Sequence, residues 1–340
     1  MDIKGASYIP EWNIEDIDIS ARLIAAYKNT KNQDRGVFSS LTPNDLWTII
    51  DGHSKIEELK KYLEKGNAEK LSKYFIEYWS TPSWFGGIDT FDSLDDNTGT
   101  YVYAELVKFI KSIGLDVYEN DNIDDIINRV SNFLDIDIIP SPVIPVSGMN
   151  TSKGIMHYRH INSLYMSIMI KKFTNSTNNI CEYGGGFGLN AYFLHKMNRK
   201  NVHIFDLPFV NVISGYFLIK ALGHDAVVLE GEEDKKDAIH IKAFWNCNKY
   251  PKNFFEVSAN QDSFPEIDIN LVNAYFEEIR FNTKSYFLSI NHEHERQFTE
   301  NSSHLNVSKI LSWLYVYNLI SRIVHPLRDG YMEEYYKINK

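Results

Sequence analysis

The chain has 340 residues, of which 44% are hydrophobic and 24% are charged. This balance is typical of a globular protein and excludes a largely disordered chain. The formal net charge of -10 disfavours a nucleic-acid partner, because phosphate backbones are bound through Lys and Arg side chains. Cys181 and Cys247 are the only cysteines, too few for a disulfide framework or a cysteine-based zinc site. We therefore expect a protein of a reducing compartment.

The start of the chain lacks the charged and apolar regions of a signal peptide. No uncharged apolar run reaches the roughly 20 residues that a bilayer-spanning helix needs. We therefore expect a cytoplasmic protein without a membrane span, and the length favours two domains.

The first part of the chain, up to about residue 137, indicates helices joined by polar loops. Thr42-Pro43-Asn44-Asp45 is typical of a helix start, with a capping residue, a proline and an acid in the first turn. Residues 83–90 join two aromatic residues to a glycine pair, which suits either a loop that covers a ligand or a plain connector. Further helices are expected at 54–64, from 67 to about 80, at 100–112 and at 122–134.

Residues 139–148 contain three prolines and end in glycine, so we expect an extended connection and a domain boundary there. The prediction is a helical N-terminal domain over residues 1–149, which would act as a lid on the substrate. A second domain is expected over residues 150–340.

Beyond this boundary, strand and helix signals alternate, which favours an α/β domain with a mostly parallel sheet covered on both faces. Asp329-Gly330, near the C-terminus, is a hairpin signal. Residues 232–253 fit no clear element, although 239–245 has the character of an extra strand. Strands are expected at 178–183, 202–205, 226–229, 254–258 and 285–290, and helices at 155–173, 187–197, 208–222, 267–279 and 306–317.

An acid and a glycine run follow the first of these strands. Glu182 ends the strand, and Gly184, Gly186 and Gly188 follow at alternating positions. Glycine permits positive φ in a tight turn and lets the backbone approach a ligand closely. A dinucleotide fingerprint would need a further glycine at 189, which is Leu. The spacing favours S-adenosylmethionine, which has no pyrophosphate for a helix N-terminus to neutralise.

A second acid ends the next strand. The carboxylate of Asp206 is suited to accept hydrogen bonds from both ribose hydroxyls, and Leu207 to pack on an adenine ring. Asn260, which follows the fourth strand, completes the expected cofactor site.

These motifs resemble those of class I S-adenosylmethionine-dependent methyltransferases. Glu182 to Gly188, Phe205-Asp206-Leu207-Pro208, Ser263-Phe264-Pro265-Glu266 and Ser289-Ile290-Asn291 together resemble the bacterial sugar O-methyltransferases. The resemblance covers roughly residues 150–295. It implies a Rossmann-like, seven-stranded methyltransferase sheet, S-adenosylmethionine as cofactor, and a carbohydrate substrate, either a cell-surface polysaccharide or a nucleotide-sugar precursor.

Ligands of open α/β sheets sit beyond the carboxyl ends of the strands, so the acceptor should lie near residues 260–266 and 291–295. A sugar hydroxyl needs a base to take its proton, and His292 is the first candidate because much of it is neutral at cellular pH. Glu266 and Asp262 are the next candidates. The Asn/Asp-Pro-Pro-aromatic signature of methyltransferases acting on exocyclic amines is missing after the fourth strand, so base N-methylation is disfavoured.

Two further residues are candidates for substrate binding. The forked guanidinium of Arg159 suits either the methionine carboxylate of the cofactor or a substrate phosphate, and Asn291 follows the fifth strand. His292 and His294 are spaced to share a metal ion if the strand continues, but no dense Asp/Asp/His cluster is present, so a divalent metal is possible but not expected. Two alternatives remain open: an O- or N-methyltransferase of another small molecule, and a non-catalytic S-adenosylmethionine-binding module.

Overall fold

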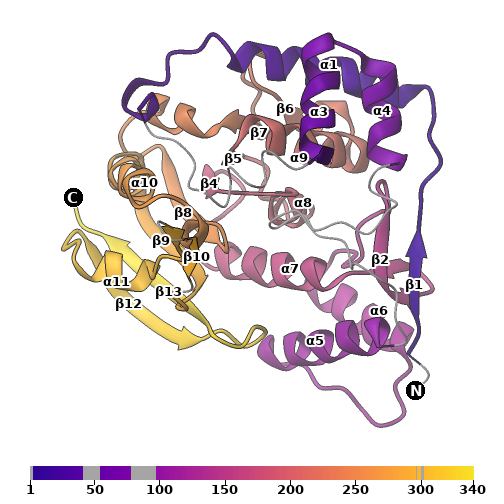
Figure 1. Cartoon of the computed structure of the whole chain (residues 1–340). Helices are drawn as coiled ribbons and strands as arrows, with labels where there is room; N and C mark the ends of the chain where they lie inside the picture. Colours follow the sequence, from indigo (N-terminus) through magenta and orange to yellow (C-terminus); the bar gives the residue numbers. More distant parts are fainter. Residues whose placement is uncertain (1–2, 41–53, 78–96, 296, 300–301) are drawn as a thin grey trace.

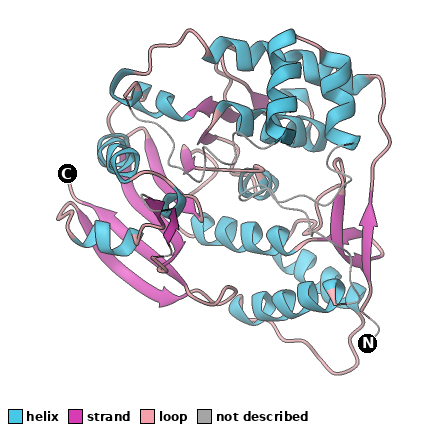
Figure 2. Ribbon diagram, in the orientation of Figure 1, coloured by secondary structure: helices cyan, strands magenta, loops and turns pink. Residues whose placement is uncertain are grey.

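A sheet with helices packed around it forms the centre of the molecule (Figures 1 and 2). The computed structural model describes residues 3–40, 54–77, 97–295, 297–299 and 302–340. Within these ranges the sheet has eight strands in the order β12-β13-β9-β8-β4-β5-β7-β6. The strands are β4 (Ile180–Tyr183), β5 (Val202–Asp206), β6 (Val227–Val228), β7 (Ile239–Ala243), β8 (Phe255–Gln261), β9 (Thr283–His292), β12 (Tyr317–Val324) and β13 (Tyr331–Ile338).

The six strands from β9 to β6 run parallel, and only β13 runs antiparallel to both of its neighbours within the described sheet. The predicted α/β fold with a mostly parallel sheet is therefore confirmed. The hairpin expected at Asp329-Gly330 joins β12 to β13.

Two hydrophobic clusters hold the helices against the two faces of this sheet. Successive residues of a strand point to opposite faces, so on β5 Ile204 belongs to the first cluster and Phe205 to the second. The first cluster takes in α7 (Tyr158–Lys171), α8 (Leu189–Lys196) and α9 (Pro208–Leu222), and the second takes in η3 (Phe244–Lys249), α10 (Ile269–Asn282) and α11 (Val307–Ser312).

The expected count of seven strands is wrong by one for the described sheet, because β7 lies between β5 and β6. All five β7 residues are buried although two are polar. His240 Nε2 lies 3.0 Å from the Lys235 carbonyl oxygen, and Lys242 Nζ lies 3.3 Å from Asp234 Oδ1. These contacts compensate the two buried polar side chains, so a strand that alternates apolar and polar residues can lie inside the sheet. The local sequence pattern does not reveal these partners.

Helices dominate the described N-terminal region, as expected. Figure 1 shows α1 (Glu15–Thr30), α3 (Ser54–Lys65) and α4 (Ala68–Glu77) beside α9, while α5 (Thr98–Ser112) packs against α7. Buried side chains of these helices and of α6 (Ile123–Leu134) belong to the same cluster as α7 to α9. The expected helix start at 42–45 and the loop at 83–90 lie outside the described residues.

A three-stranded antiparallel sheet joins the chain start to the expected boundary. β1 (Gly5–Tyr8) pairs with β2 (Val146–Thr151), which pairs with β3 (Gly154–Met156). β3 occupies the place where a helix was expected from residue 155. The helix begins only at Tyr158, because the His157 side chain caps it by accepting from Arg159 N.

The proposed domain boundary after residue 149 falls inside β2. The division into two domains stays a prediction. None of the helices in the described ranges is long and apolar enough to span a membrane.

Candidate active site

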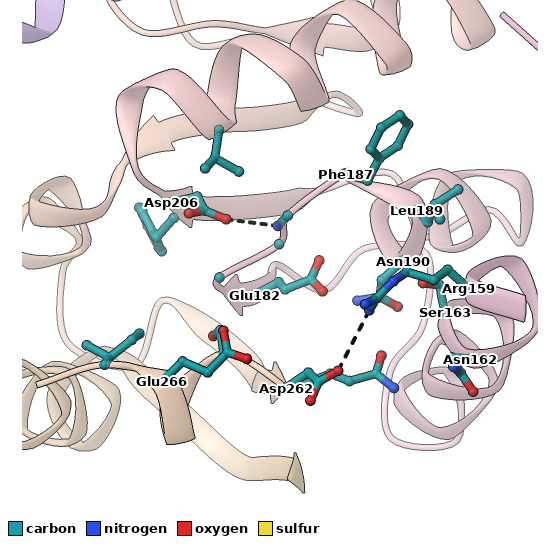
Figure 3. A pocket seen from close by; sticks show the side chains of 18 of the residues that line it. Arg159, Asn162, Ser163, Glu182, Phe187, Leu189, Asn190, Asp206, Asp262 and Glu266 are labelled. Carbon is teal, nitrogen blue, oxygen red and sulfur yellow. Dashed lines mark hydrogen bonds and ion pairs between the residues drawn. The ribbon is translucent and has the colours of Figure 1, made fainter. Parts of the chain in front are cut away.

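A cavity of about 420 Å³ lies where the parallel strands end at their carboxyl edge (Figure 3). Its described lining includes residues from the start of α7, the loop after β4, the end of β5, the residue after β7, the segment after β8, the end of β9 and the turn before β13, together with side chains of α9 and α10. Ligands of open α/β sheets bind at this edge. Most residues predicted for the cofactor and for the acceptor line this cavity, and we name its two parts after those predictions. The cofactor half is lined by Glu182, residues 184–187, Asp206 and Leu207, and the acceptor half by Arg159, Asp262, Glu266, His292, Arg328 and Tyr331.

The glycine loop forms the floor of the cofactor half. Gly184, Gly186 and Gly188 all have positive φ, at 71°, 53° and 83°. A Cβ atom on Gly184 would lie 2.0 Å from Ser263 Oγ, so a side chain does not fit there. Gly188 is the N-cap of α8 and shapes the turn without lining the cavity.

Glu182 lies beneath this loop and is only 4% exposed. Burial raises the pKa of its carboxyl to about 7, the Asn190 side chain opposes the rise, and the charge of Asp206 adds to it. Its Oε2 atom accepts no hydrogen bond from the described residues. A buried acceptor without a partner is costly, so this position suits a ligand that brings a donor or a positive charge.

Asp206 connects the end of β5 to the glycine loop. Its Oδ2 accepts from Gly186 N at 2.8 Å, and its Oδ1 accepts from Leu207 N at 2.7 Å. Burial raises the pKa of Asp206 to about 6, and these two backbone donors oppose the rise. A carboxylate has about four acceptor positions, so each oxygen can still accept a ligand hydroxyl.

The wall beside Asp206 is apolar. Leu207, Val210 and Leu271 line the cavity together with the rings of Phe244 and Tyr275. Phe244 follows directly after β7, which the sequence indicated only as a possible extra strand. This wall offers a flat ligand an apolar face next to a carboxylate, which fits an adenosine.

The acceptor half is built around Asp262, a non-glycine residue with φ of +70°. Arg328 Nη1 donates to Asp262 Oδ2, and the Tyr331 hydroxyl donates to Asp262 Oδ1 at 2.6 Å. Arg159 Nη1 lies 3.7 Å from Asp262 Oδ2 (Figure 3). Burial raises the pKa of Asp262, but the charges of Arg328 and Arg159 outweigh it and hold the pKa below its usual value. Asp262 is therefore a weak base.

His292 ends β9 and is 7% exposed. Its ring centroid lies 4.4 Å from that of His304 and 5.6 Å from that of Tyr331. Burial lowers the pKa of His292, although the charge of Asp262 opposes this, so the ring is neutral near pH 7 and can accept a proton. Glu266 also lines the cavity.

His294 does not line the cavity, and its ring centroid is 6.3 Å from that of His292. Among the described residues, no group of three or more His, Cys, Asp or Glu side chains is arranged to hold a metal ion.

Asn260 and Asn291, two of the predicted ligand contacts, are bonded to other parts of the protein. The Asn260 Nδ2 donates to the Tyr183 carbonyl oxygen at 2.8 Å and to Ser263 Oγ at 2.5 Å. Its Oδ1 accepts from Asn291 Nδ2 at 3.0 Å. Both side chains thus fix the loop after β8 against β4, and neither is among the described residues that line the cavity.

The sequence missed Arg328, Tyr331 and His304, which line the cavity from segments far along the chain. Arg328 and Tyr331 flank the Asp-Gly hairpin signal, which indicated a turn but no role for its neighbours. Only the pairing of β13 with β9, in which Tyr331 lies opposite His292, brings this turn to the cavity.

No family model and no curated protein matches the chain. Solved structures similar to it include a geranyl diphosphate C-methyltransferase from Streptomyces coelicolor A3(2), with a TM-score of 0.40 and 10% identity over 53% of this chain and 80% of that one. A glycopeptide N-methyltransferase has a TM-score of 0.39 and 10% identity over 52% and 90%. An S-adenosylmethionine-dependent methyltransferase from Aquifex aeolicus has a TM-score of 0.36 and 15% identity over 50% and 88%.

Proposed function

We propose that the chain is an S-adenosylmethionine-dependent methyltransferase. The observation that carries this proposal is the cofactor half of the cavity. There a buried carboxylate with one oxygen that accepts no hydrogen bond from the described residues, a glycine loop with no room for a side chain at Gly184, and a second carboxylate lie together. Glu182 suits the ammonium group of the methionine part, Asp206 the ribose hydroxyls, and Leu207 and Phe244 the adenine.

S-adenosylmethionine, when bound, supplies an activated methyl group on a sulfonium cation. The residues of this chain would align the acceptor hydroxyl with that methyl group and exclude water. Alignment of this kind can lower a barrier by roughly 7–11 kcal/mol. His292 would accept the hydroxyl proton as the new C–O bond forms, which typically adds 10²- to 10⁴-fold in rate. Glu266 is the second candidate for this base, and the ion-paired Asp262 is the third.

We further propose a sugar hydroxyl as the acceptor, in a cytoplasmic polysaccharide or nucleotide-sugar pathway. The support is the resemblance of the motifs and the polar character of the acceptor half, where Arg159, Asp262, Arg328 and Tyr331 meet. A phenol or another apolar acceptor would be expected to face a more apolar wall. In this proposal the N-terminal region forms a separate lid domain over the acceptor.

Calorimetry with S-adenosylhomocysteine and with NAD tests the cofactor assignment. We expect S-adenosylhomocysteine to bind and NAD not to bind; tighter binding of NAD would overturn the assignment. Mass spectrometry of cell-surface glycans from strains with and without the gene tests the acceptor. Loss of one methyl group from one sugar would identify it, whereas unchanged glycans would contradict the carbohydrate proposal.

A further inference from the structure

Asn162 is a buried polar residue in the wall of the cavity. It is 5% exposed and belongs to α7. Neither its Nδ2 nor its Oδ1 has a hydrogen-bond partner among the described residues, and within this part of the chain it is the one buried asparagine or glutamine with both amide atoms in that state. A buried amide without partners is costly, so this position suits a ligand that both donates and accepts hydrogen bonds.

The position of Asn162 on α7 directs it to the acceptor half. Residues three apart are neighbours on a helix surface. Asn162 therefore lies between Arg159, which approaches the carboxylate of the acceptor half, and Tyr165, which donates to a carboxylate of β13. Figure 3 shows Asn162 and Arg159 on this helix. Another flank of α7 faces α8, where Ser167 Oγ donates to Asn190 Oδ1 at 2.7 Å.

Gln261 reaches the same space from the sheet. It ends β8, and because the side chains of a strand alternate between faces, it shares a face with Ala259. Ala259 belongs to the hydrophobic cluster that contains α7, so α7 covers this face. Gln261 lines the cavity, and its buried Nε2 donates to none of the described residues. In the sheet it lies opposite Ile290 of β9, two residues before His292, the proposed base.

We propose that Asn162 and Gln261 form a neutral hydrogen-bonding subsite that binds neighbouring hydroxyl groups of the acceptor. The amide of Asn162 presents an acceptor oxygen and a donor nitrogen side by side, and a hydroxyl can both donate and accept. Two adjacent hydroxyls of a sugar ring therefore match both atoms, and a further oxygen of the ring can accept from Gln261 Nε2.

This inference rests on the proposed methyltransferase function and deepens it, because it assigns residues that recognise the hydroxyl pattern of the substrate. A site built to bond a hydroxyl discriminates strongly against an analogue without it, since the buried polar groups of the site are then left unpaired. Asn162 and Gln261 would thus determine which polyhydroxylated acceptor is methylated.

The amino-acid part of the cofactor is a competing partner, because its ammonium and carboxylate groups also match the two amide atoms of Asn162. Calorimetry with S-adenosylhomocysteine and with 5′-methylthioadenosine, which lacks the amino-acid part, separates the two ligands. We expect Asn162→Leu to leave the affinity for both nearly unchanged. A loss of affinity for S-adenosylhomocysteine alone would show that Asn162 holds the cofactor, and would overturn this inference.

Thermal unfolding of the ligand-free protein shows whether the Asn162 side chain serves the fold. Leu has the same branched arrangement of heavy atoms and needs no partner, so Asn162→Leu should leave the melting temperature unchanged or raise it by a few degrees. Asn282→Leu is the matched control, in a second helix and with a side chain that is fully buried. Its Nδ2 donates to the Cys247 carbonyl oxygen at 3.0 Å, and its Oδ1 accepts from Thr283 Oγ1 at 3.3 Å.

The control should lower the melting temperature clearly, because two buried hydrogen bonds are lost. Both substitutions replace Asn by the better helix former Leu, so that gain is common to them. An equal fall for Asn162→Leu and the control would mean that Asn162 has a structural role, and would overturn the inference.

Saturation-transfer NMR on the S-adenosylhomocysteine-loaded protein tests the ligand class, with the methyl glycosides of glucose, galactose, mannose and rhamnose as probes. We expect at least one glycoside to bind the wild type. Asn162→Leu and Gln261→Met should each weaken this binding about tenfold or more, while Asn282→Leu leaves it nearly unchanged. Deoxygenation of one of the two matched hydroxyls should weaken binding to the wild type but not to Asn162→Leu.

The inference is overturned if none of these glycosides binds the wild type, or if binding survives both Asn162→Leu and Gln261→Met. Failure of the wild type to bind S-adenosylhomocysteine would instead contradict the proposed function.

Discussion

At the scale of single residues, two buried carboxylates define the cofactor half of the cavity. Burial raises the pKa of Glu182 to about 7 and that of Asp206 to about 6. Near neutral pH, Glu182 is thus close to its midpoint in the ligand-free protein. A ligand that brings an ammonium group favours the ionised form, so its binding must release protons when the pH is at or below these values.

We therefore predict that the affinity for S-adenosylhomocysteine rises with pH between about 6 and 7 and levels off above this range. The slope is positive because the ionised carboxylates are the binding form and their pKa values lie in this window. Calorimetry at several pH values, in buffers of different ionisation enthalpy, measures both the affinity and the protons released.

Glu182→Gln should flatten this pH dependence and weaken binding. Glu278→Gln is the matched control, because burial also raises the pKa of Glu278 but this side chain does not line the cavity. An affinity independent of pH in the wild type would contradict the proposed role of Glu182.

His292 is the residue on which the chemical step depends in our proposal. With an acceptor identified from the glycan comparison, His292→Ala should lower kcat by roughly 10²- to 10⁴-fold and leave the affinity for S-adenosylhomocysteine nearly unchanged. Because burial lowers the pKa of His292, the rise of the wild-type rate with pH should lie below the ordinary histidine value of about 6.5. If Glu266→Gln abolishes turnover while His292→Ala keeps it, the carboxylate is the base.

The sequence placed polar residues at the ligand edge of the sheet, but it did not show which of their side chains face the cavity. Asn260 was expected after the fourth strand, but it lies within β8, near the carboxyl end. Its side chain makes four hydrogen bonds, to Tyr183, Ser263, Phe264 and Asn291, and it is not among the described residues that line the cavity. The direction of a side chain at a strand end depends on the loops that neighbouring strands contribute, and a single sequence does not contain that information.

At the scale of elements, the glycine loop can be tested by a change that adds one methyl group. Gly184→Ala introduces a Cβ atom 2.0 Å from Ser263 Oγ at a φ of +71°. Gly114→Ala is the control, because φ is +81° there and, apart from its chain neighbours, no atom of the described residues lies within 4 Å of the added Cβ. The control should cost about 1–2 kcal/mol of stability through backbone strain alone.

Gly184→Ala should cost clearly more than this control and also weaken S-adenosylhomocysteine binding, because the loop must move away from Ser263. Urea unfolding and calorimetry on both variants measure the two effects. Equal losses of stability with unchanged binding would mean that the loop tolerates the displacement and does not contact the ligand closely.

The alternating elements after residue 176 were predictable because their signals are local. β4, β5, α9 and the segment from β8 to β9 all lie within a few residues of their expected bounds. β7 lies within residues 239–245, which the sequence indicated only as a possible extra strand. The β1–β2–β3 sheet was not predicted, because its pairing depends on distant partners. Ser7 Oγ, for example, lies 2.7 Å from Ser147 Oγ across 140 residues of chain.

At the scale of the whole molecule, the described N-terminal helices share one hydrophobic cluster with α7, α8 and α9. Polar contacts add to this packing. Arg22 of α1 donates to both carboxylate oxygens of Glu232, at 2.6 and 2.7 Å, and to the Val227 carbonyl oxygen at 2.6 Å. Asp16 of α1, buried and 2.7 Å from Lys220 Nζ of α9, joins the same two regions.

The Asp16–Lys220 pair allows the two-domain division to be tested by unfolding. Lys220→Met leaves a buried carboxylate without its cation, a change that typically costs about 3–5 kcal/mol. If α1 and α9 unfold as one unit, scanning calorimetry should show this variant melting in a single transition at lower temperature. Lys31→Ala, which removes the exposed pair with Glu64, should cost at most about 1 kcal/mol. The opposite outcome is that the wild type melts in two transitions and Lys220→Met shifts only one of them. This would support separate domains, since the helices before residue 150 would then unfold independently of the sheet that carries the cavity.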